Sequence, residues 1–328
     1  MITVYFKDVG QGDSIVIEWT HNNEKLIGII DCHRYQGFNP TLEFLKSNQI
    51  AKIEFIILTH FHYDHFSGMA DIFDFCVQNG IRVKYFYHTI QPFIGDIYNR
   101  IFKSQKLQLE TKRFLESYDS FDSKVGDKIP VTHQVKSLRL NDQYSLSFLA
   151  PQGKTYDKMS RQLARKAAKV STAISDINKL STIVFIEDET RGILLTGDAV
   201  KNSFKKNRGR LGKEIILAQV PHHGSWKNID EKFWLQLNKK LLTPAVFSVG
   251  DEPKDKLPNE LTVEFFDKNG FEIFSTNSTY GLDSYFKLGS SSVASRKGSI
   301  LNSVSKLRKT STSSKSGKYE GDKVFKFV

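Results

Sequence analysis

The sequence predicts a mixed α/β protein in which two strand-rich halves are each accompanied by helices. Residues 53–59, Ile-Glu-Phe-Ile-Ile-Leu-Thr, form a continuous apolar run of strand length, which is typical of a strand buried on both faces. Short Val- and Ile-rich runs precede it, and similar runs return after residue 180 with helical segments between them. This alternation fits either a doubly wound sheet or a four-layer sandwich.

The first half begins with strands and continues as alternating helices and strands. Turn-forming residues at Gly10-Gln11-Gly12-Asp13 and at His21-Asn22-Asn23 separate the first strands. Pro40 starts a helix and Asn79-Gly80 ends another. The predicted strands are 2–7, 14–18, 26–31, 53–59 and 82–88, and the predicted helices are 40–48 and 66–79.

The second half follows a polar segment at about 90–140, which we interpret as a helical insertion over the scaffold. The predicted strands are 144–149, 181–187, 191–196, 215–220, 244–249 and 271–275, and the predicted helices are 154–169, 228–239 and 258–268. We expect one domain over 1–285 and a basic Ser/Lys-rich tail over 286–328, with disorder in its low-complexity part.

Composition excludes several classes of protein. With 39% hydrophobic and 25% charged residues among 328, the chain can bury a full-sized core and is not globally disordered. It has no apolar run near the roughly 18 residues of a membrane helix, and its first residues lack a secretion signal, so we expect no membrane insertion and a cytoplasmic location. Cys32 and Cys76 are too few for a disulfide framework or a thiolate zinc cluster.

Positive charge is concentrated at the end of the chain and in two internal runs. The net charge is +11, and residues 291–328 contribute nine basic and two acidic residues to it. Residues 154–169 hold six basic residues against Asp157, and residues 201–213 hold six without an acid. Such segments are either solvated faces or binding surfaces for polyanions such as nucleic acid.

Three histidines and an aspartate follow the buried strand within six residues. In an extended loop, residues two apart project the same way, so His60 and His62 can bind one metal ion. Asp64 and His65 then point elsewhere and can begin a second site. Imidazole nitrogens and carboxylate oxygens suit zinc, iron or manganese.

Three further strand ends carry the same residue types. Asp198 follows Gly197 at the end of an apolar strand, where a carboxylate can bridge two metal ions. The adjacent His222 and His223 follow another strand, and Asp31 ends a third.

Together these four strand ends resemble the metallo-β-lactamase superfamily, whose most specific motif is the string His60-x-His62-x-Asp64-His65. The motifs Asp8-Val9-Gly10-Gln11-Gly12-Asp13, Asn178-x-x-Ser181, Thr196-Gly197-Asp198 and Pro221-His222-His223-Gly224-Ser225 look like the metallo-β-lactamase-like domain of ComEC competence proteins. The resemblance covers about residues 1–280. It implies an αββα sandwich with metal ions at one edge between the sheets.

The resemblance also implies roles for individual residues. His60 and His62 bind the first metal ion, Asp64, His65 and His222 bind the second, and Asp198 bridges the two. Asp31 orients a histidine by accepting its other N–H. The expected cofactors are two ions of Zn²⁺ or Mn²⁺, with Asp64 and Asp198 as the catalytic carboxylates.

One departure from the superfamily pattern concerns the first metal site. The superfamily usually supplies a third histidine there, yet residues 134–221 contain none. Asn178 or Ser181 occupies the corresponding region, so we expect a weak or labile first site. His223 is an alternative to His222 as the ligand, and we favour His222.

The sequence therefore favours a metal-dependent hydrolase, specifically a phosphodiesterase or nuclease whose basic runs bind phosphates. Ser225 either donates a hydrogen bond to a phosphate oxygen or caps the next helix. Two alternatives remain open: a non-nucleolytic metallo-hydrolase of the phosphocholine ester or lactone type, and a catalytically weakened binding module. The sequence does not reveal whether the chain has a partner protein.

Overall fold

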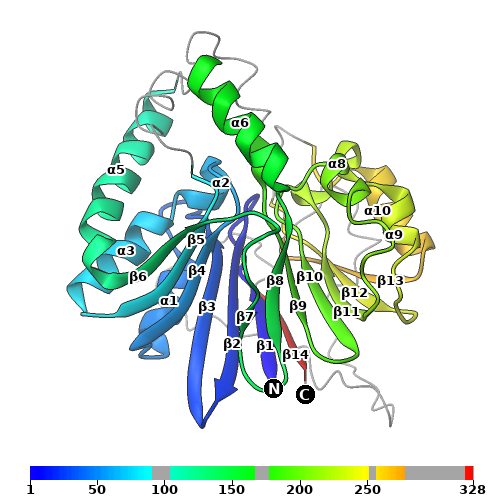
Figure 1. Ribbon diagram of the computed structural model, residues 1–328, viewed down its shortest axis with the longest axis horizontal. Coiled ribbons are helices and arrows are strands. Elements are labelled where there is room, and N and C mark those ends of the chain that lie inside the picture. Colours follow the sequence, from blue (N-terminus) through cyan, green and yellow to red (C-terminus); the bar gives the residue numbers. More distant parts are fainter. Residues whose placement is uncertain (91–103, 167–176, 251–255, 278–321, 328) are drawn as a thin grey trace.

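A computed structural model of the chain describes residues 1–90, 104–166, 177–250, 256–277 and 322–327 (Figure 1). These residues form two seven-stranded sheets that pack face to face, with helices on the outer face of each sheet. The four-layer αββα sandwich is thus confirmed, and the doubly wound sheet is excluded.

The first sheet combines an antiparallel and a parallel half. Strands β3 to β6 run parallel, so their carboxyl ends lie at the same edge, while β14, β1, β2 and β3 pair antiparallel. The order in the sheet is β14 (Lys323–Phe327), β1 (Ile2–Phe6), β2 (Ser14–His21), β3 (Glu24–Cys32), β4 (Lys52–Leu58), β5 (Arg82–His88) and β6 (Val125–Pro130).

The second sheet has the same division. Strands β10 to β13 are parallel, and β7 to β10 are antiparallel. The order is β13 (Phe271–Ser275), β12 (Thr243–Phe247), β11 (Glu214–Gln219), β10 (Arg191–Leu195), β9 (Ile183–Glu187), β8 (Ser145–Ala150) and β7 (Leu138–Arg139).

The helices cover the outer faces and one edge of the sandwich (Figure 1). Those on the first sheet are α1 (Pro40–Ser47), α2 (Tyr63–Phe66), α3 (Met69–Gln78) and α5 (Gln105–Phe121), and those on the second are α8 (Lys201–Lys205), α9 (Glu231–Leu235) and α10 (Glu260–Lys268). Helix α6 (Gly153–Lys166) lies above the upper edge of the sandwich in Figure 1, between α2 on the first half and α8 on the second. None of the described helices has both the length and the apolar composition that crossing a membrane requires.

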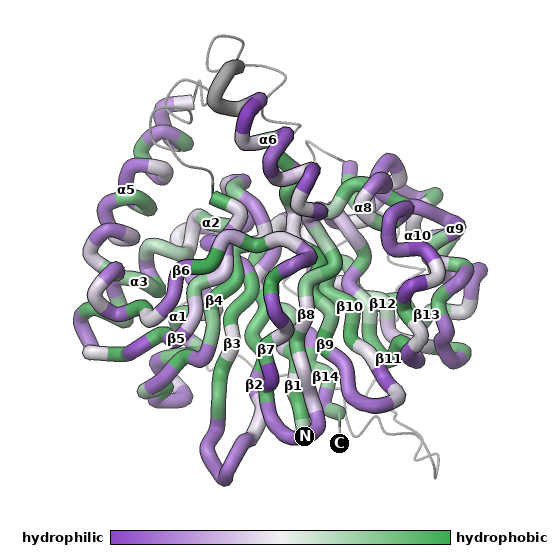
Figure 2. Tube along the Cα trace, viewed as in Figure 1, coloured by the Kyte–Doolittle hydropathy of each residue, from purple (hydrophilic) through white to green (hydrophobic). Residues whose placement is uncertain are grey.

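Strand alternation produces one apolar core between the two sheets and one beneath the helices of each sheet. On β4, Phe55 and Ile57 face the core between the sheets, whereas Ile56 and Leu58 face the helices. On β9, Val184 and Ile186 face the core between the sheets and Phe185 faces the helices of the second half. The apolar residues consequently lie along the buried strands in Figure 2.

Several elements differ from the sequence prediction. The helix expected at 66–79 is divided into α2 and α3 at Gly68, and the helix expected at 228–239 is reduced to α9. A short helix, α8, forms at the start of the basic run 201–213. The described part of the segment 90–140 is built into the scaffold, because α5 packs on α3 and β6 extends the first sheet.

The end of the chain also differs from the expected tail. Residues 323–327 form β14, which pairs with β1 from Ile2 opposite Phe327 to Phe6 opposite Lys323. Because charged residues surround this short apolar run, the sequence predicted a tail here. The low-complexity stretch 291–316, where disorder is predicted, lies outside the described part of the chain; the domain boundary at 285 stays a prediction.

Replacement of Phe325 by alanine should lower the free energy of unfolding by about 3–5 kcal/mol, because its fully buried ring packs against Phe6 and Phe274. Urea unfolding followed by circular dichroism measures this change. The half-buried Lys326 on the same strand provides the control, Lys326→Ala, for which we expect a change below about 1 kcal/mol. Equal stability of the two variants would contradict the placement of β14.

Candidate metal centre

The predicted site residues converge where strand ends from both sheets meet. Asp31 lies near the end of β3, His60 to His65 follow β4, Asp198 follows β10, and His222 and His223 follow β11. A backbone contact joins the two sheets here, because the N–H of Thr182 donates to the carbonyl of Thr59 at 3.1 Å. The site therefore stands on strand ends that are joined to each other across the two sheets.

Asp198 is held in place by the backbone around it. Its N–H donates to Ser181 Oγ at 2.9 Å. Gly197 has φ +46°, and a Cβ there would lie 2.9 Å from Ser181 Oγ and 3.2 Å from Thr59 Oγ1. Glycine thus permits the close approach that aims the carboxylate into the site.

One oxygen of Asp198 faces a first group of side chains. Its Oδ1 lies 3.3 Å from His65 Nε2 and 3.6 Å from His223 Nε2. Asp64 joins this group, with Oδ2 at 3.1 Å from His223 Nε2. The potential ligand atoms of these four residues all lie within 4.8 Å of one another.

The other oxygen of Asp198 faces a second group. Its Oδ2 lies 3.5 Å from His222 Nε2 and 3.8 Å from His60 Nε2. His60 Nε2 is in turn 3.1 Å from His62 Nδ1, and ligand atoms of His60, His62 and Asp198 lie within 4.8 Å of one another. Asp198 therefore stands between the two groups.

The placement of the two adjacent histidines differs from the prediction. We expected His222 beside Asp64 and His65, and His223 outside the ligand set; instead His223 lies beside Asp64, and His222 lies on the side of His60. The reason is the turn at 222–224, in which three successive residues have positive φ, at 50°, 53° and 84°. Such a turn directs both imidazoles into the site.

Each of these histidines has a separate partner for its second ring nitrogen. Asn178 Nδ2 lies 3.2 Å from His222 Nδ1, and the carbonyl of Ser248 lies 2.7 Å from His223 Nδ1. Ser225 closes the turn, because its N–H donates to the carbonyl of His222 at 2.9 Å.

Asp31 lies behind His65 rather than facing Asp198. His65 Nδ1 is 2.7 Å from Asp31 Oδ2, and the N–H and hydroxyl of Thr59 donate to the same carboxylate at 2.8 and 2.6 Å. Burial raises the pKa of Asp31 to about 6, although the neighbouring imidazole of His65 lowers it.

Three residues near the site were not assigned to it from the sequence. Asp13, which we interpreted as a turn former, has Oδ2 3.8 Å from His65 Nδ1 and accepts a 2.8 Å bond from Gln219. Gln219 Oε1 also accepts from the N–H groups of Thr196 and Gly197, so it joins the first sheet to the Asp198 loop. The third, His33, is buried, and its Nδ1 lies 2.7 Å from Ser67 Oγ. In the sequence, only the position of Asp13 and Gln219 next to the ends of strands could have indicated that they lie at the site.

Comparison with known proteins agrees with this architecture. Residues 8–136 match the family model described as the metallo-β-lactamase superfamily. The chain has the metallo-β-lactamase fold.

Individual relatives are distant. A hydroxyacylglutathione hydrolase of Legionella pneumophila (strain Paris) is 30% identical over 91 residues, which are 28% of this chain and 34% of that protein; the match thus spans about a third of the curated relative. Among solved structures, the metallo-β-lactamase fold protein YhfI from Bacillus subtilis has a TM-score of 0.43 at 10% identity, over 85% of this chain and 98% of that one. Zn²⁺-bound PqqB from Methylobacterium extorquens has a TM-score of 0.46 at 7% identity, over 84% and 98%.

Burial and nearby opposite charges determine the pKa values of the residues at this site of the metallo-β-lactamase fold. Burial alone would raise the pKa of Asp198, but the surrounding imidazoles hold it well below its usual range. Burial alone would lower the pKa of both His65 and His223, but the carboxylates raise the first well above its usual range and the second to about 9. Burial and the neighbouring imidazoles lower the pKa of His60 well below its usual range.

The donor set fits divalent cations. Among the described residues, the buried atoms His65 Nε2 and Asp198 Oδ1 have no hydrogen-bond partner, an arrangement that is costly for buried polar groups. Both face the centre of the first group, where nitrogen and oxygen donors are the ligands that zinc and manganese accept. The fold itself implies a divalent metal; its identity as Zn²⁺ or Mn²⁺ stays a prediction.

Metal uptake should depend on pH up to about pH 9. His65 and His223 are protonated in the metal-free protein at neutral pH, since their pKa values are raised, and a cation must displace these protons. Apparent affinity should therefore rise about tenfold per pH unit for each proton displaced. Competition with a chromophoric chelator between about pH 6 and pH 9 measures it; a plateau by about pH 7, as for unperturbed histidines, would contradict the assignment.

Proposed function

We propose that this chain is a metal-dependent phosphodiesterase that acts on nucleic acid. The observation that carries the proposal is the position of the carboxylate–imidazole cluster beside a cationic surface. His60, His65, Asp198 and His223 are buried, whereas His62, Asp64 and His222 are partly exposed. The cluster is therefore accessible from one side, on which a substrate can reach it.

The residues of the cluster divide the work between holding cations and orienting ligands. In this proposal His60, His62 and His222 hold one divalent ion, Asp64, His65 and His223 hold a second, and Asp198 contacts both. When bound, such a pair lowers the pKa of a water molecule and polarises the substrate oxygen. Asp31 fixes the tautomer of His65 by accepting from its Nδ1, and Asn178 fixes the ring of His222.

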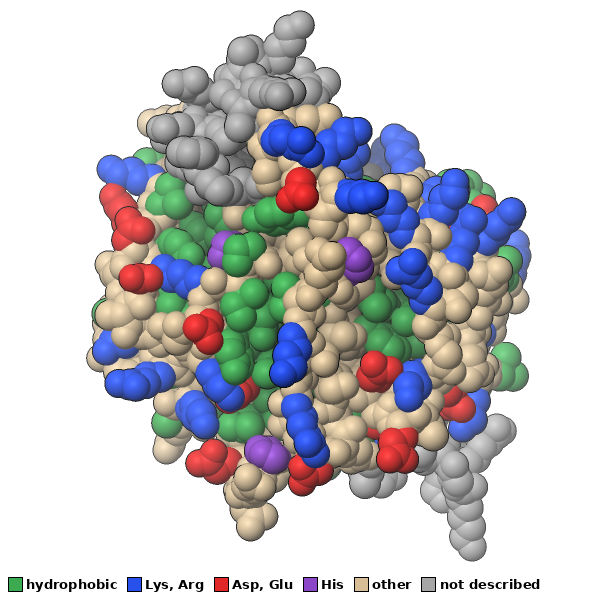
Figure 3. Space-filling view, in the orientation of Figure 1, with side chains coloured by type: hydrophobic (Ala, Val, Ile, Leu, Met, Phe, Trp, Pro, Cys, Tyr) green, Lys and Arg blue, Asp and Glu red, His purple; other side chains and the backbone are tan. Residues whose placement is uncertain are grey.

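The surroundings favour a phosphate ester over other substrates. Lys and Arg side chains gather over α6 and α8 in Figure 3, next to the edge where the cluster lies. The exposed cations there are Lys154, Lys158, Arg161, Lys201, Lys205, Lys206 and Arg210. Ammonium and guanidinium groups bind phosphate oxygens through charge-assisted hydrogen bonds. We include two expectations from the sequence in this proposal: that the motifs are those of a ComEC-like competence domain, and that the protein is cytoplasmic.

A second candidate is a metallo-hydrolase that acts on an ester other than a nucleic acid. The similarity to hydroxyacylglutathione hydrolase over 91 residues favours it. The other alternative, a catalytically weakened binding module, was favoured by the missing third histidine of the first site; the position of His222 on the side of His60 argues against it.

Replacement of either His62 or Asp198 by alanine should lower metal-dependent cleavage of DNA or RNA by at least about 100-fold, because each removes a proposed ligand. Hydrolysis rates with Mn²⁺ or Zn²⁺ measure the loss, with circular dichroism to show that the fold survives. A panel that also contains a phosphocholine ester, a lactone and a thioester separates the two candidates.

His21→Ala is the matched control, because His21 lies at the opposite end of β2 from the site, about 24 Å away at the usual rise per strand residue. Its activity should equal that of the wild type. Full activity in the His62 or Asp198 variant would refute the proposed roles, and activity on the non-nucleotide esters alone would replace the first candidate by the second.

A further inference from the structure

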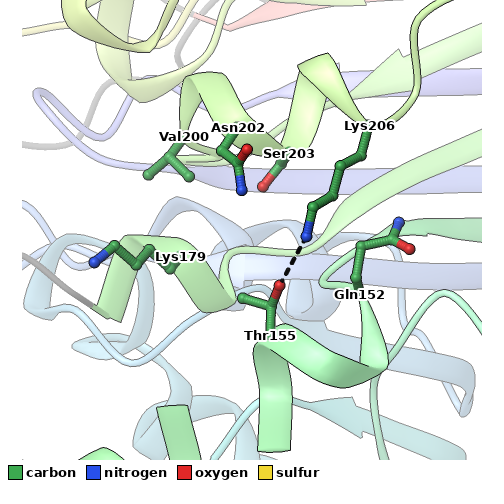
Figure 4. Close-up of a pocket in the computed structure, with 7 residues that line it drawn as sticks. All are labelled: Gln152, Thr155, Lys179, Val200, Asn202, Ser203 and Lys206. Carbon is green, nitrogen blue, oxygen red and sulfur yellow. Dashed lines mark hydrogen bonds between the residues drawn. The ribbon is translucent and has the colours of Figure 1, made fainter. Parts of the chain in front are cut away.

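A small hollow lies between the beginning of α6 and the turn around α8 (Figure 4). Its volume is about 80 Å³, several times what one water molecule requires. Thr155 lies on the side of α6, Asn202 and Ser203 lie on the side of α8, and Lys179 comes from the short turn η2 (Asn178–Leu180). Lys206 extends across the hollow to Thr155 Oγ1, with Nζ at 3.2 Å.

The chemistry of the lining suits an oxyanion. Two lysines and several hydroxyl and amide groups line the hollow, and none of the described residues that line it carries a carboxylate. Two other cations of the basic run 201–213 are engaged elsewhere. Arg208 donates to both oxygens of Asp230 at 2.8 and 2.6 Å, and Lys213 donates to the carbonyl of Glu189. Lys206 is an exposed ammonium that instead contacts a neutral hydroxyl.

The hollow adjoins the metal cluster through two short stretches of chain. Val200, on its wall, follows Asp198 by two residues, so their Cα atoms are at most ~7 Å apart. Lys179 directly follows Asn178, which contacts His222. The hollow therefore lies near the cluster on the side of His222, where a second phosphate of an extended strand could reach it.

We propose that this hollow, formed by Lys179 and Lys206 with Thr155, Asn202 and Ser203, binds a substrate phosphate other than the one that is hydrolysed. The inference rests on the proposed function and narrows it. The preferred substrate is a single strand with several phosphates, because a small diester with one phosphate cannot occupy both places.

The test is binding of a fluorescent thymidine oligonucleotide about twelve residues long to the full chain, followed by anisotropy in the presence of a chelator that prevents cleavage. The double variant Lys179→Ala/Lys206→Ala should bind about tenfold more weakly. The slope of log affinity against log salt should fall by about 0.7, since the hollow holds one phosphate and each phosphate contact on a single strand contributes about 0.7.

Lys25→Ala/Lys52→Ala is the matched control, because it removes the same charge from exposed lysines at the amino ends of β3 and β4. The affinity of this control for the oligonucleotide, and its slope of log affinity against log salt, should remain within about twofold of the wild-type values. The reason is that the removed charges lie far from the hollow and are screened by salt. Equal losses in the two double variants, an unchanged Lys179/Lys206 variant, or no binding by the wild type would each overturn the inference.

Inorganic phosphate distinguishes a strand phosphate from a free anion. When inorganic phosphate and unlabelled strand are added at the same total concentration of phosphate groups, we expect inorganic phosphate to displace the fluorescent strand much less. Equal displacement by the two would assign the hollow to a free anion and overturn the inference.

A hydrolysis assay distinguishes failure of this inference from failure of the proposed function. Loss of binding in the variant without cleavage of any diester by the wild type would refute the hydrolysis and leave strand binding, whereas cleavage with unchanged binding would refute the hollow alone.

Discussion

The buried carboxylate of Asp198 is the interaction on which the site depends. Its two oxygens face different groups of imidazoles, at 3.3 and 3.6 Å on one side and at 3.5 and 3.8 Å on the other. The negative charge of Asp198 and its neighbouring carboxylates raises the pKa values of His65 and His223, although burial lowers them. So many ionisable groups in one buried place are costly unless they serve a charged ligand.

The scaffold holds this arrangement by joining the two sheets at their strand ends. Gln219 on β11 donates to Asp13 before β2 and accepts from the backbone that precedes Asp198. Asp31, His222 and His223 all have positive φ, a conformation that non-glycine residues adopt at a cost and that concentrates at functional sites. The energy of the packed sandwich thus maintains a geometry that the local backbone disfavours.

The sequence predicted the buried strands well because they depend on local patterns. The apolar run before His60 and the strand predicted at 82–88 correspond to β4 and β5, and the residues of the histidine motif lie together at the site, while their role as ligands stays a prediction. The sequence could not separate His222 from His223, because the direction of adjacent side chains depends on the turn at 222–224. Nor could it find β14 or the contribution of Gln219, since these depend on pairing with residues more than 200 positions away.

The most direct test of the account is an anomalous difference map from crystals grown with Mn²⁺ or Zn²⁺. The account predicts two peaks, one on each side of Asp198, with His60, His62 and His222 around one and Asp64, His65 and His223 around the other. A map without a peak at Asp198, from crystals that contain the metal in excess, would contradict it.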